Sequence, residues 1–157
     1  MSYFSDTPLL PTLVQTLAIL KITRPTDIQT QSMQPLLDGQ SLMGVSETGS
    51  GKTLAYVLPL IHKLKSLELD GFAVSKPRHP RGLILVPGRE LGEQVSKVLK
   101  ALTHDTRLRV RTALGGSKKK VSRKSVAGVF EILVATPGRL DTFVTDGEVN
   151  LSDVRTV

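Results

Sequence analysis

The sequence contains no cysteine and no long apolar run. Without thiols, a disulfide scaffold and a zinc site built on thiolates are excluded, and the composition fits a reducing compartment. No apolar stretch approaches the ~18–20 residues that a membrane-spanning helix needs. The first residues, MSYFSDTPLLP, lack a basic head followed by an apolar segment, so no signal peptide is predicted. These absences predict a cytoplasmic protein without a membrane segment.

The chain is short and basic. Its 157 residues carry a formal net charge of +7, with a sequence pI of about 9.9. This length suits one domain with a real core, but not two. The surplus of Lys and Arg favours polyanionic partners such as nucleic acid, although many solvated proteins are also basic.

The apolar spacing alternates between helical and strand-like segments. Asp6 or Thr7 is a candidate cap for the first helix. Helices are predicted near 10–20, 26–37, 52–65, 90–102 and 137–144, and a basic helix or loop at 117–129. Residues 66–81 are predicted to form a surface loop.

Short apolar runs predict buried strands between these helices. They lie at 41–45, 82–86, 108–114 and 131–135, and another strand begins at 154–157. Strands that alternate with helices predict an α/β fold, with a parallel sheet covered on both faces.

The stretch SETGSGKT, Ser46 to Thr53, joins a predicted strand to a predicted helix. Gly49 and Gly51 can adopt backbone angles that direct N–H groups at an anion on the helix N-terminus. Lys52 can reach the β- and γ-phosphates, and the Thr53 hydroxyl can bind Mg²⁺. Ser46 replaces the glycine of the strict pattern, and an ordinary glycine-rich turn is the alternative. The loop predicts a nucleotide site without distinguishing a helicase from a kinase or a GTPase.

Further motifs follow in a recognisable order. Together with the loop, the sequence resembles the DEAD-box RNA helicase family through PTDIQ at 25–29, PGREL at 87–91, GG at 115–116 and TPGRL at 136–140. Phe4 also lies at the expected distance before Gln29. The resemblance runs over nearly the whole chain. It implies a RecA-like P-loop domain that binds ATP, Mg²⁺ and RNA, and in this family a small residue such as Ser46 can open the loop.

The resemblance implies a nucleotide site with a base pocket. The Gln29 amide suits the N6 and N7 edge of adenine. In the family this glutamine selects adenine and an aromatic at the position of Phe4 stacks on the ring; by itself, Gln29 would be a solvated helix residue and Thr26 a helix cap. The implied cofactor-binding residues are Phe4, Arg24, Thr26, Gln29, Ser46, Glu47, Thr48, Gly49, Ser50, Gly51, Lys52 and Thr53, with Lys52 and Thr53 catalytic and Thr53 the metal ligand.

A second set of residues is implied to hold the RNA backbone. These contacts position a strand without reading bases, so binding should be sequence-independent and sensitive to salt. Plain helix capping is the alternative for Thr136, and a brace to Glu90 is the alternative for Arg89. The implied nucleic-acid-binding residues are Pro87, Gly88, Arg89, Gly116, Thr136, Pro137, Gly138 and Arg139.

Several positions depart from the family or lie outside its motifs. The family usually has Thr at position 88 and Ala at position 92, where this sequence has glycine. Two basic groups are interpreted as solvated faces, with RNA contact as the alternative for the first; they are Lys118, Lys119, Lys120, Arg123 and Lys124, and Arg107, Arg109 and Arg111.

The Asp-Glu-Ala-Asp motif of the family is absent, and the resemblance places it just after Val157. The chain is therefore expected to be the front part, residues 1–157, of a longer helicase whose second RecA-like domain is missing. Alone, it should bind adenine nucleotide weakly and hydrolyse essentially none. The alternatives are a non-catalytic nucleotide- or RNA-binding scaffold of the same fold, and another P-loop enzyme such as a small-molecule kinase.

Overall fold

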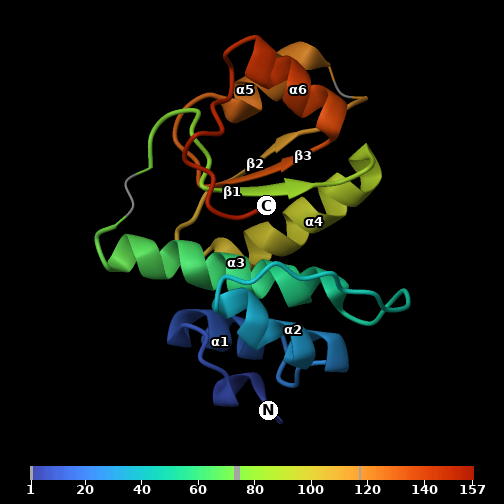
Figure 1. The fold of residues 1–157 in the computed structure, drawn as a ribbon, viewed down its shortest axis with the longest axis vertical. Coiled ribbons are helices and arrows are strands. Elements are labelled where there is room, and N and C mark those ends of the chain that lie inside the picture. Colours follow the sequence, from blue (N-terminus) through green and yellow to red (C-terminus); the bar gives the residue numbers. More distant parts are fainter. Residues whose placement is uncertain (1, 73–74, 117) are drawn as a thin grey trace. The chain divides into compact units, whose positions relative to one another are not determined.

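The computed structural model describes residues 2–72, 75–116 and 118–157, without the side chains of 119–122 (Figure 1). The chain divides into two compact units, residues 1–67 and 68–157. No helix in the described ranges is long and apolar enough to cross a bilayer.

The N-terminal unit is helical. It contains a 3₁₀ turn, η1 (Phe4–Asp6), followed by α1 (Pro11–Ile19), α2 (Asp27–Leu37) and most of α3 (Lys52–Leu69). The fully buried side chains that join these elements include Phe4, Leu13, Leu17, Met33, Leu58 and Ile61. The predicted helices are confirmed because their apolar spacing brings these side chains onto the packed faces.

Two details of the predicted helices were wrong. The N-cap of α1 is Leu10, with Pro11 in the first turn, so neither Asp6 nor Thr7 caps it. The Asp6 carboxylate instead accepts a hydrogen bond from the Tyr3 amide at 3.0 Å. In addition, α3 continues to Leu69, so the predicted loop begins later than residue 66.

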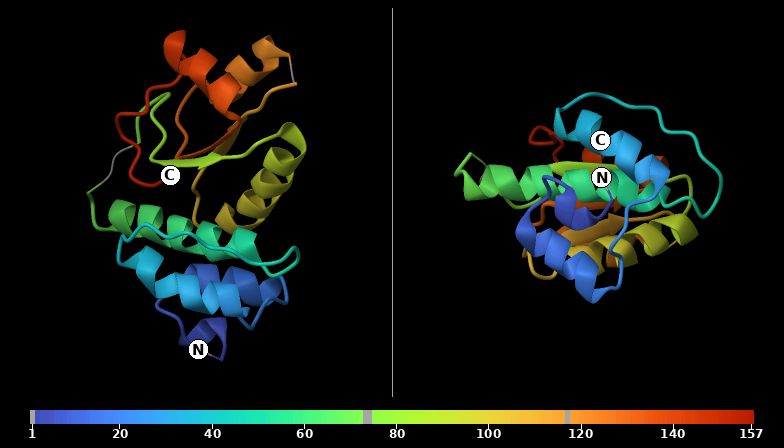
Figure 2. Two further views of the ribbon diagram at one scale, coloured as in Figure 1. Left: turned by 45° about the vertical axis from the view of Figure 1, so that its right-hand side comes forward. Right: turned by 90° about the horizontal axis from the view of Figure 1, so that it is seen from below.

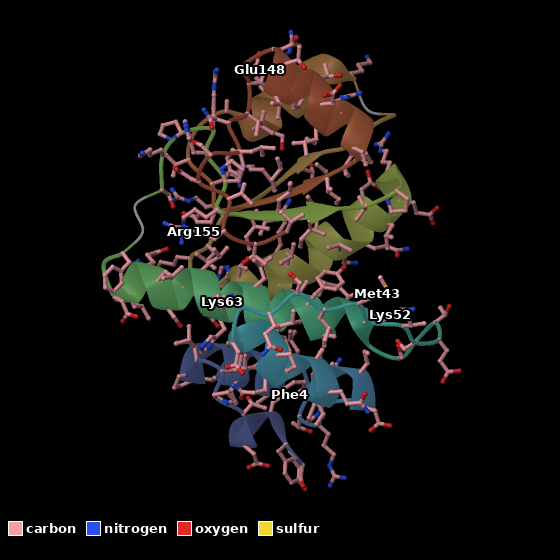
Figure 3. All side chains as sticks on the ribbon, in the orientation of Figure 1. Phe4, Met43, Lys52, Lys63, Glu148 and Arg155 are labelled. Atoms are coloured by element: carbon pink, nitrogen blue, oxygen red, sulfur yellow. The ribbon has the colours of Figure 1, made fainter. Side chains whose placement is uncertain are left out.

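The predicted strand at 41–45 is also wrong. This stretch has no regular structure, and Leu42, Met43 (labelled in Figure 3) and Val45 are 45%, 92% and 85% exposed. A strand needs a neighbour for its backbone hydrogen bonds. The described residues of the N-terminal unit include no strand at all, so the apolar run has nothing to pair with there.

The C-terminal unit is built on a parallel sheet. Strands β1 (Gly82–Leu85), β2 (Val110–Ala113) and β3 (Ile132–Ala135) lie in the order β1-β3-β2. Leu133 of β3 is in register with Leu83 and Arg111. The predicted strand start at 154–157 is present as a single parallel bridge between Thr156 and Gly82.

Helices cover both faces of this sheet, as predicted. Figures 1 and 2 show α5 (Lys119–Val126) and α6 (Pro137–Thr145) on one face and α4 (Arg89–Thr103) on the other. The core beneath α5 and α6 includes Leu83, Val126, Phe130, Leu133, Leu140 and Phe143. Because the three strands are parallel, their carboxyl ends lie at one edge of the sheet. Each predicted RNA motif follows one of these strands.

A buried carboxylate joins the starts of β2 and β3. Glu131 is 2% exposed and accepts hydrogen bonds from the Arg109 amide and from Arg109 Nη2, both at 2.6 Å, and from Ser75 Oγ at 3.1 Å. Burial alone would raise the pKa of Glu131, but the bonds from Arg109 and Ser75 lower it overall. Arg109 thus helps to hold the starts of β2 and β3 together through Glu131.

Candidate nucleotide and nucleic-acid sites

The glycine loop has the backbone conformation that its residues predicted. Gly49 and Gly51 have φ angles of +83° and +88°, which a side chain would strain. Helix α3 begins directly after them at Lys52, and the Ala55 amide donates to the Gly51 carbonyl. The loop therefore lies at the N-terminus of a long helix, where free N–H groups and the helix dipole favour an anion.

Side chains of the loop also bond to one another. Lys52 Nζ donates to the Ser46 carbonyl at 2.6 Å, and the Ser46 and Ser50 hydroxyls are 2.5 Å apart. Figure 3 shows Lys52 at the start of α3. Ser46, which departs from the strict pattern, thus contributes a hydroxyl that closes the loop, while Glu47 and Thr48 are exposed.

Gln29 holds the glycine loop from α2. Its side chain is 2% exposed, and its Nε2 donates to the Gly51 carbonyl at 3.1 Å. Its Oε1 accepts from the Thr26 amide at 2.9 Å, which is one half of a capping box. A Cβ atom built on Gly51 would lie only 2.5 Å from Gln29 Nε2. Two motifs that are 22 residues apart therefore meet at one backbone carbonyl.

The two predicted partners of the base, Phe4 and Arg24, have different surroundings. Phe4 is 1% exposed and packs in the unit core, so its stacking on adenine stays a prediction that would need its ring to move. The neighbouring Tyr3 is 42% exposed. Arg24 Nη2 donates to the Tyr3 hydroxyl at 2.8 Å, and its guanidinium lies 4.8 Å from the centre of the Tyr3 ring. Sequence reasoning missed Tyr3, although an aromatic beside Phe4 was a visible signal.

Thr53 lies in the first turn of α3, where a phosphate-bound metal could reach it. Burial raises the pKa of Tyr56, and a hydrogen bond with the Thr53 side chain opposes that rise. No group of three or more His, Cys, Asp or Glu side chains suited to a metal occurs within the described ranges.

The predicted RNA residues come together at the carboxyl ends of the strands. Arg89, at the start of α4, donates from Nη1 to the Gly116 carbonyl at 3.2 Å and from Nε to Glu93 Oε1 at 3.0 Å. The Gly115 amide donates to Thr136 Oγ1 at 2.8 Å. Turns that follow β1, β2 and β3 are therefore joined to one another. The proposed brace between Arg89 and Glu90 is replaced by one to Glu93, one helical turn further on.

Thr136 occupies the N-cap position of α6 but does not cap the helix with its side chain. Its hydroxyl accepts from Gly115 instead. Pro137 and Gly138 are exposed at the first turn, and the Arg139 guanidinium lies 5.8 Å from the Phe143 ring centre. The first N–H groups of α6 are thus left without a side-chain cap from Thr136, as an anion site requires.

The two glycines that depart from the family differ in their surroundings. No atom lies within 4 Å of a Cβ built on Gly88, the N-cap of α4, so a side chain would fit there. A Cβ on Gly92 would lie 2.5 Å from Leu114 Cδ2 and 3.1 Å from Val86 Cγ2. The missing side chain of Gly92 therefore leaves room for Leu114.

Of the two basic groups, Lys118, Arg123 and Lys124 are exposed, and Arg123 pairs with Asp146 at 3.0 Å. The side chains of Lys119 and Lys120 lie outside the described residues. Arg107 and Arg109 are exposed and Arg111 is partly exposed, as the interpretation of a solvated face expects, but Arg109 also pairs with the buried Glu131.

Comparison with known proteins covers most of the chain. It is similar to DEAD-box ATP-dependent RNA helicase 39 of Arabidopsis thaliana, with 36% identity over 135 residues, 86% of this chain and 22% of that protein. A DEAD box protein from Methanococcus jannaschii superimposes with a TM-score of 0.81 and 27% identity, covering 97% of this chain and 39% of that one. The RNA helicase Prp28 from Chaetomium thermophilum bound to ADP superimposes with a TM-score of 0.83 and 29% identity, covering 98% and 37%.

The chain thus spans well under half of the length of these proteins. Their similarity confirms the predicted RecA-like α/β fold. A family model described as DEAD/DEAH box helicase matches residues 26–157, which include the glycine loop and all three turns predicted to bind RNA. Since this match takes in most of the sequence, the chain belongs to the DEAD/DEAH box helicase family.

Proposed function

We propose that this chain is the N-terminal ATP- and RNA-binding part, residues 1–157, of a DEAD-box ATP-dependent RNA helicase. In the full-length protein it would couple ATP binding and hydrolysis to local unwinding of RNA. The observation that carries the proposal is the bond from Gln29 to Gly51, because it joins the residue suited to adenine to the loop suited to phosphate.

For the nucleotide, each group has a distinct role. The backbone amides from Gly49 to Lys52 would hold the phosphates, and Lys52 would exchange its bond with Ser46 for the β- and γ-phosphates. Thr53 would bind the Mg²⁺ ion that accompanies ATP. Beyond its bonds to Thr26 and Gly51, the Gln29 amide has one hydrogen and one lone pair that suit the adenine edge, but Gln29 is 2% exposed and would have to become accessible on binding. Phe4 or the exposed Tyr3, with Arg24, would face the ring.

For RNA, the joined turns at the strand ends offer backbone N–H groups and charge. Arg89, Gly116 and the segment 136–139 would contact phosphates, and none of these contacts reads a base. We therefore expect sequence-independent binding that weakens steeply with salt. A cytoplasmic location also stays a prediction.

Catalysis needs groups that this sequence does not contain, since it has no Asp-Glu-Ala-Asp motif. We expect the 157-residue chain to bind adenine nucleotide without turning it over. The alternative, a non-catalytic scaffold of the same fold, differs in the residues that follow the motifs rather than in these contacts.

Binding of fluorescent ADP and GDP analogues tests the nucleotide site. We expect a preference for the adenine analogue, a loss of at least tenfold in affinity in Lys52→Ala, and a loss of base preference in Gln29→Ala. Lys63→Ala removes the same charge from the same helix and should bind as the unchanged chain does. Equal binding of both analogues, with Gln29→Ala silent, would instead favour another P-loop enzyme.

A further inference from the structure

Two hollows lie beside α4 in the C-terminal unit. The larger, about 570 Å³, is lined by Lys100, His104, Arg107, Leu108, Arg109 and Arg111, among others. The second, about 370 Å³, lies between the middle of α4 and β2 and shares Lys100 with the first. The larger hollow is called the basic groove below. None of the RNA motifs lines either hollow.

The groove is continuous with the RNA turns along one face of α4. Arg89, Glu93, Lys97, Lys100 and His104 are spaced by three or four residues, so they share a stripe on the helix. Glu93 and Lys97 line the smaller hollow, and Lys100 and His104 line the groove. The stripe therefore runs from the Arg89 turn to the far end of the helix, about 22 Å at 1.5 Å per residue.

Most of the positive charge on this path is not neutralised by the protein. Glu93, the acidic residue of the stripe, pairs with Arg89, and Arg109 pairs with Glu131. Within the part of the chain that the structure describes, Lys97, Lys100 and Arg107 form no ion pair. Arg111 lies on β2, the end strand of the sheet, and its Nη1 donates to the Val110 carbonyl.

The backbone at Arg107 is strained, and hydrogen bonds in the preceding turn hold it in place. Its φ angle is +58°, a conformation that strains residues with a side chain. The preceding turn is fixed by Thr106 Oγ1, which donates to the Thr103 carbonyl at 3.1 Å, and by Thr103 Oγ1, which donates to the Leu99 carbonyl at 2.8 Å. Glycine or asparagine would fit this turn with less strain. A basic side chain stands there and lines the groove.

We propose that the backbone of bound RNA extends from the Arg89 turn along the α4 stripe into the basic groove, where Lys100, Arg107 and Arg111 contact its phosphates. The proposal rests on the proposed RNA binding of this family member. RNA is favoured over an acidic peptide because the stripe begins at a predicted RNA residue, and because separate point charges along a path of this length suit successive phosphates.

Fluorescence anisotropy of a labelled single-stranded oligouridylate, titrated with the full 157-residue chain across a salt series, tests the extension. The groove variant Lys100→Ala/Arg107→Ala should bind several-fold more weakly. It should also lower the slope of log K against log salt by about 1.4, or about 0.7 for each lost phosphate contact on a single strand. Lys97→Ala/Lys100→Ala is a second variant in a helix that alanine favours, so it remains folded and should act in the same direction.

The matched control is Lys76→Ala/Arg155→Ala, which removes two exposed charges from the same unit at residues that line neither hollow. An equal loss in the control would mean that only net charge matters and would overturn the groove contact. If Arg89→Ala weakens binding while both groove variants bind as the unchanged chain does, the extension fails and the proposed function stands.

The remaining outcomes are also decisive. If the unchanged chain does not bind RNA at all, the proposed RNA function fails together with the extension. If the groove variants keep their RNA affinity but lose binding of a polyglutamate peptide, the groove is a surface for an acidic protein and the RNA extension is overturned.

Discussion

Both units contain turns that are predicted to bind anions, but the two units hold these turns in different ways. In residues 68–157, the turns at 87–89, 115–116 and 136–139 each follow a hydrogen-bonded strand, and Arg89 and Thr136 join them to the Gly115-Gly116 turn. In residues 1–67, the glycine loop follows an exposed stretch that is not a strand. A side-chain hydrogen bond from Gln29 of α2 reaches this loop at the Gly51 carbonyl.

A turn suited to an anion can therefore be held by a sheet or by local side-chain bonds, and the two kinds of support differ in rigidity. A turn at the end of a strand inherits the rigidity of the ladder. A loop that rests on a few side-chain bonds depends on each of them.

Amide hydrogen exchange should separate the two designs most strongly. Residues 41–47 have no regular structure and are mostly exposed, so their amides should exchange at nearly the intrinsic rate. The amides of β3 should need the opening of the C-terminal unit, up to its global free energy of unfolding of about 5–15 kcal/mol. Mass spectrometry of exchanged peptides measures both. Comparable protection of 41–47 and 132–135 would show that the first stretch is paired after all.

Arg109→Ala should lower the free energy of unfolding of the C-terminal unit. It leaves Glu131 buried without its guanidinium partner, and we expect a loss near the lower end of the about 3–5 kcal/mol typical of such a deletion, because Arg109 is half exposed. Urea unfolding followed by circular dichroism gives the value. Arg123→Ala, which loses a partner on the surface, should cost about 1 kcal/mol or less.

The two tyrosines, Tyr3 and Tyr56, both lie in residues 1–67. Their fluorescence therefore follows the N-terminal unit only, and its transition should be the same in Arg109→Ala as in the unchanged chain. A matching shift of the tyrosine signal would contradict independent anchoring of the two units.

Gly51→Ala and Gly49→Ala form a matched pair within the glycine loop. Both introduce a side chain at positive φ, which costs about 1–2 kcal/mol. Only the first also displaces the buried Gln29 amide, for about 1–3 kcal/mol more, because no atom lies within 4 Å of a Cβ on Gly49. Thermal unfolding followed by tyrosine fluorescence, with ADP-analogue binding, should rank Gly51→Ala as the more damaging. Adding Gln29→Ala should make the Gly51→Ala effect smaller.

The pH dependence should also differ between the units. Burial lowers the pKa of His62, whose Nδ1 accepts the Leu10 amide at 3.1 Å, so the unfolded chain binds the proton more readily. The contribution of His62 is therefore lost as the pH falls below its ordinary pKa of 6.5. The pKa of Glu131 lies below its ordinary 4.5, so its contribution is present above that value and is lost as the pH falls further.

Tyrosine fluorescence should thus report a loss of stability near pH 6, where the C-terminal unit is still unaffected by Glu131. His62→Gln keeps an acceptor for Leu10 but does not titrate, and it should abolish that early phase. Survival of the early phase in this variant would assign it to another group.

Much of the fold followed from patterns within short segments. The strands at 82–85 and 132–135 were predictable because their apolar runs are bounded by turns, and the helix at 89–103 because its apolar residues recur at helical spacing. The backbone conformation at Gly49 and Gly51 was predictable because few residues other than glycine tolerate such φ angles. The stretch at 41–45 has an equally strand-like composition, but the strand predicted there is absent. Strand pairing depends on a neighbour that composition does not reveal.

The sequence by itself determined which segments can be helices, where the chain must turn, and which residues can hold phosphate, because these depend on side chains and dihedral angles close together in the chain. The packing of the chain set the contact between Gln29 and Gly51, the burial of Phe4 beside the exposed Tyr3, and the pairing of Arg109 with the buried Glu131. Burial, ion pairing and strand pairing depend on residues far apart in the sequence, and only the packed chain brings those residues together.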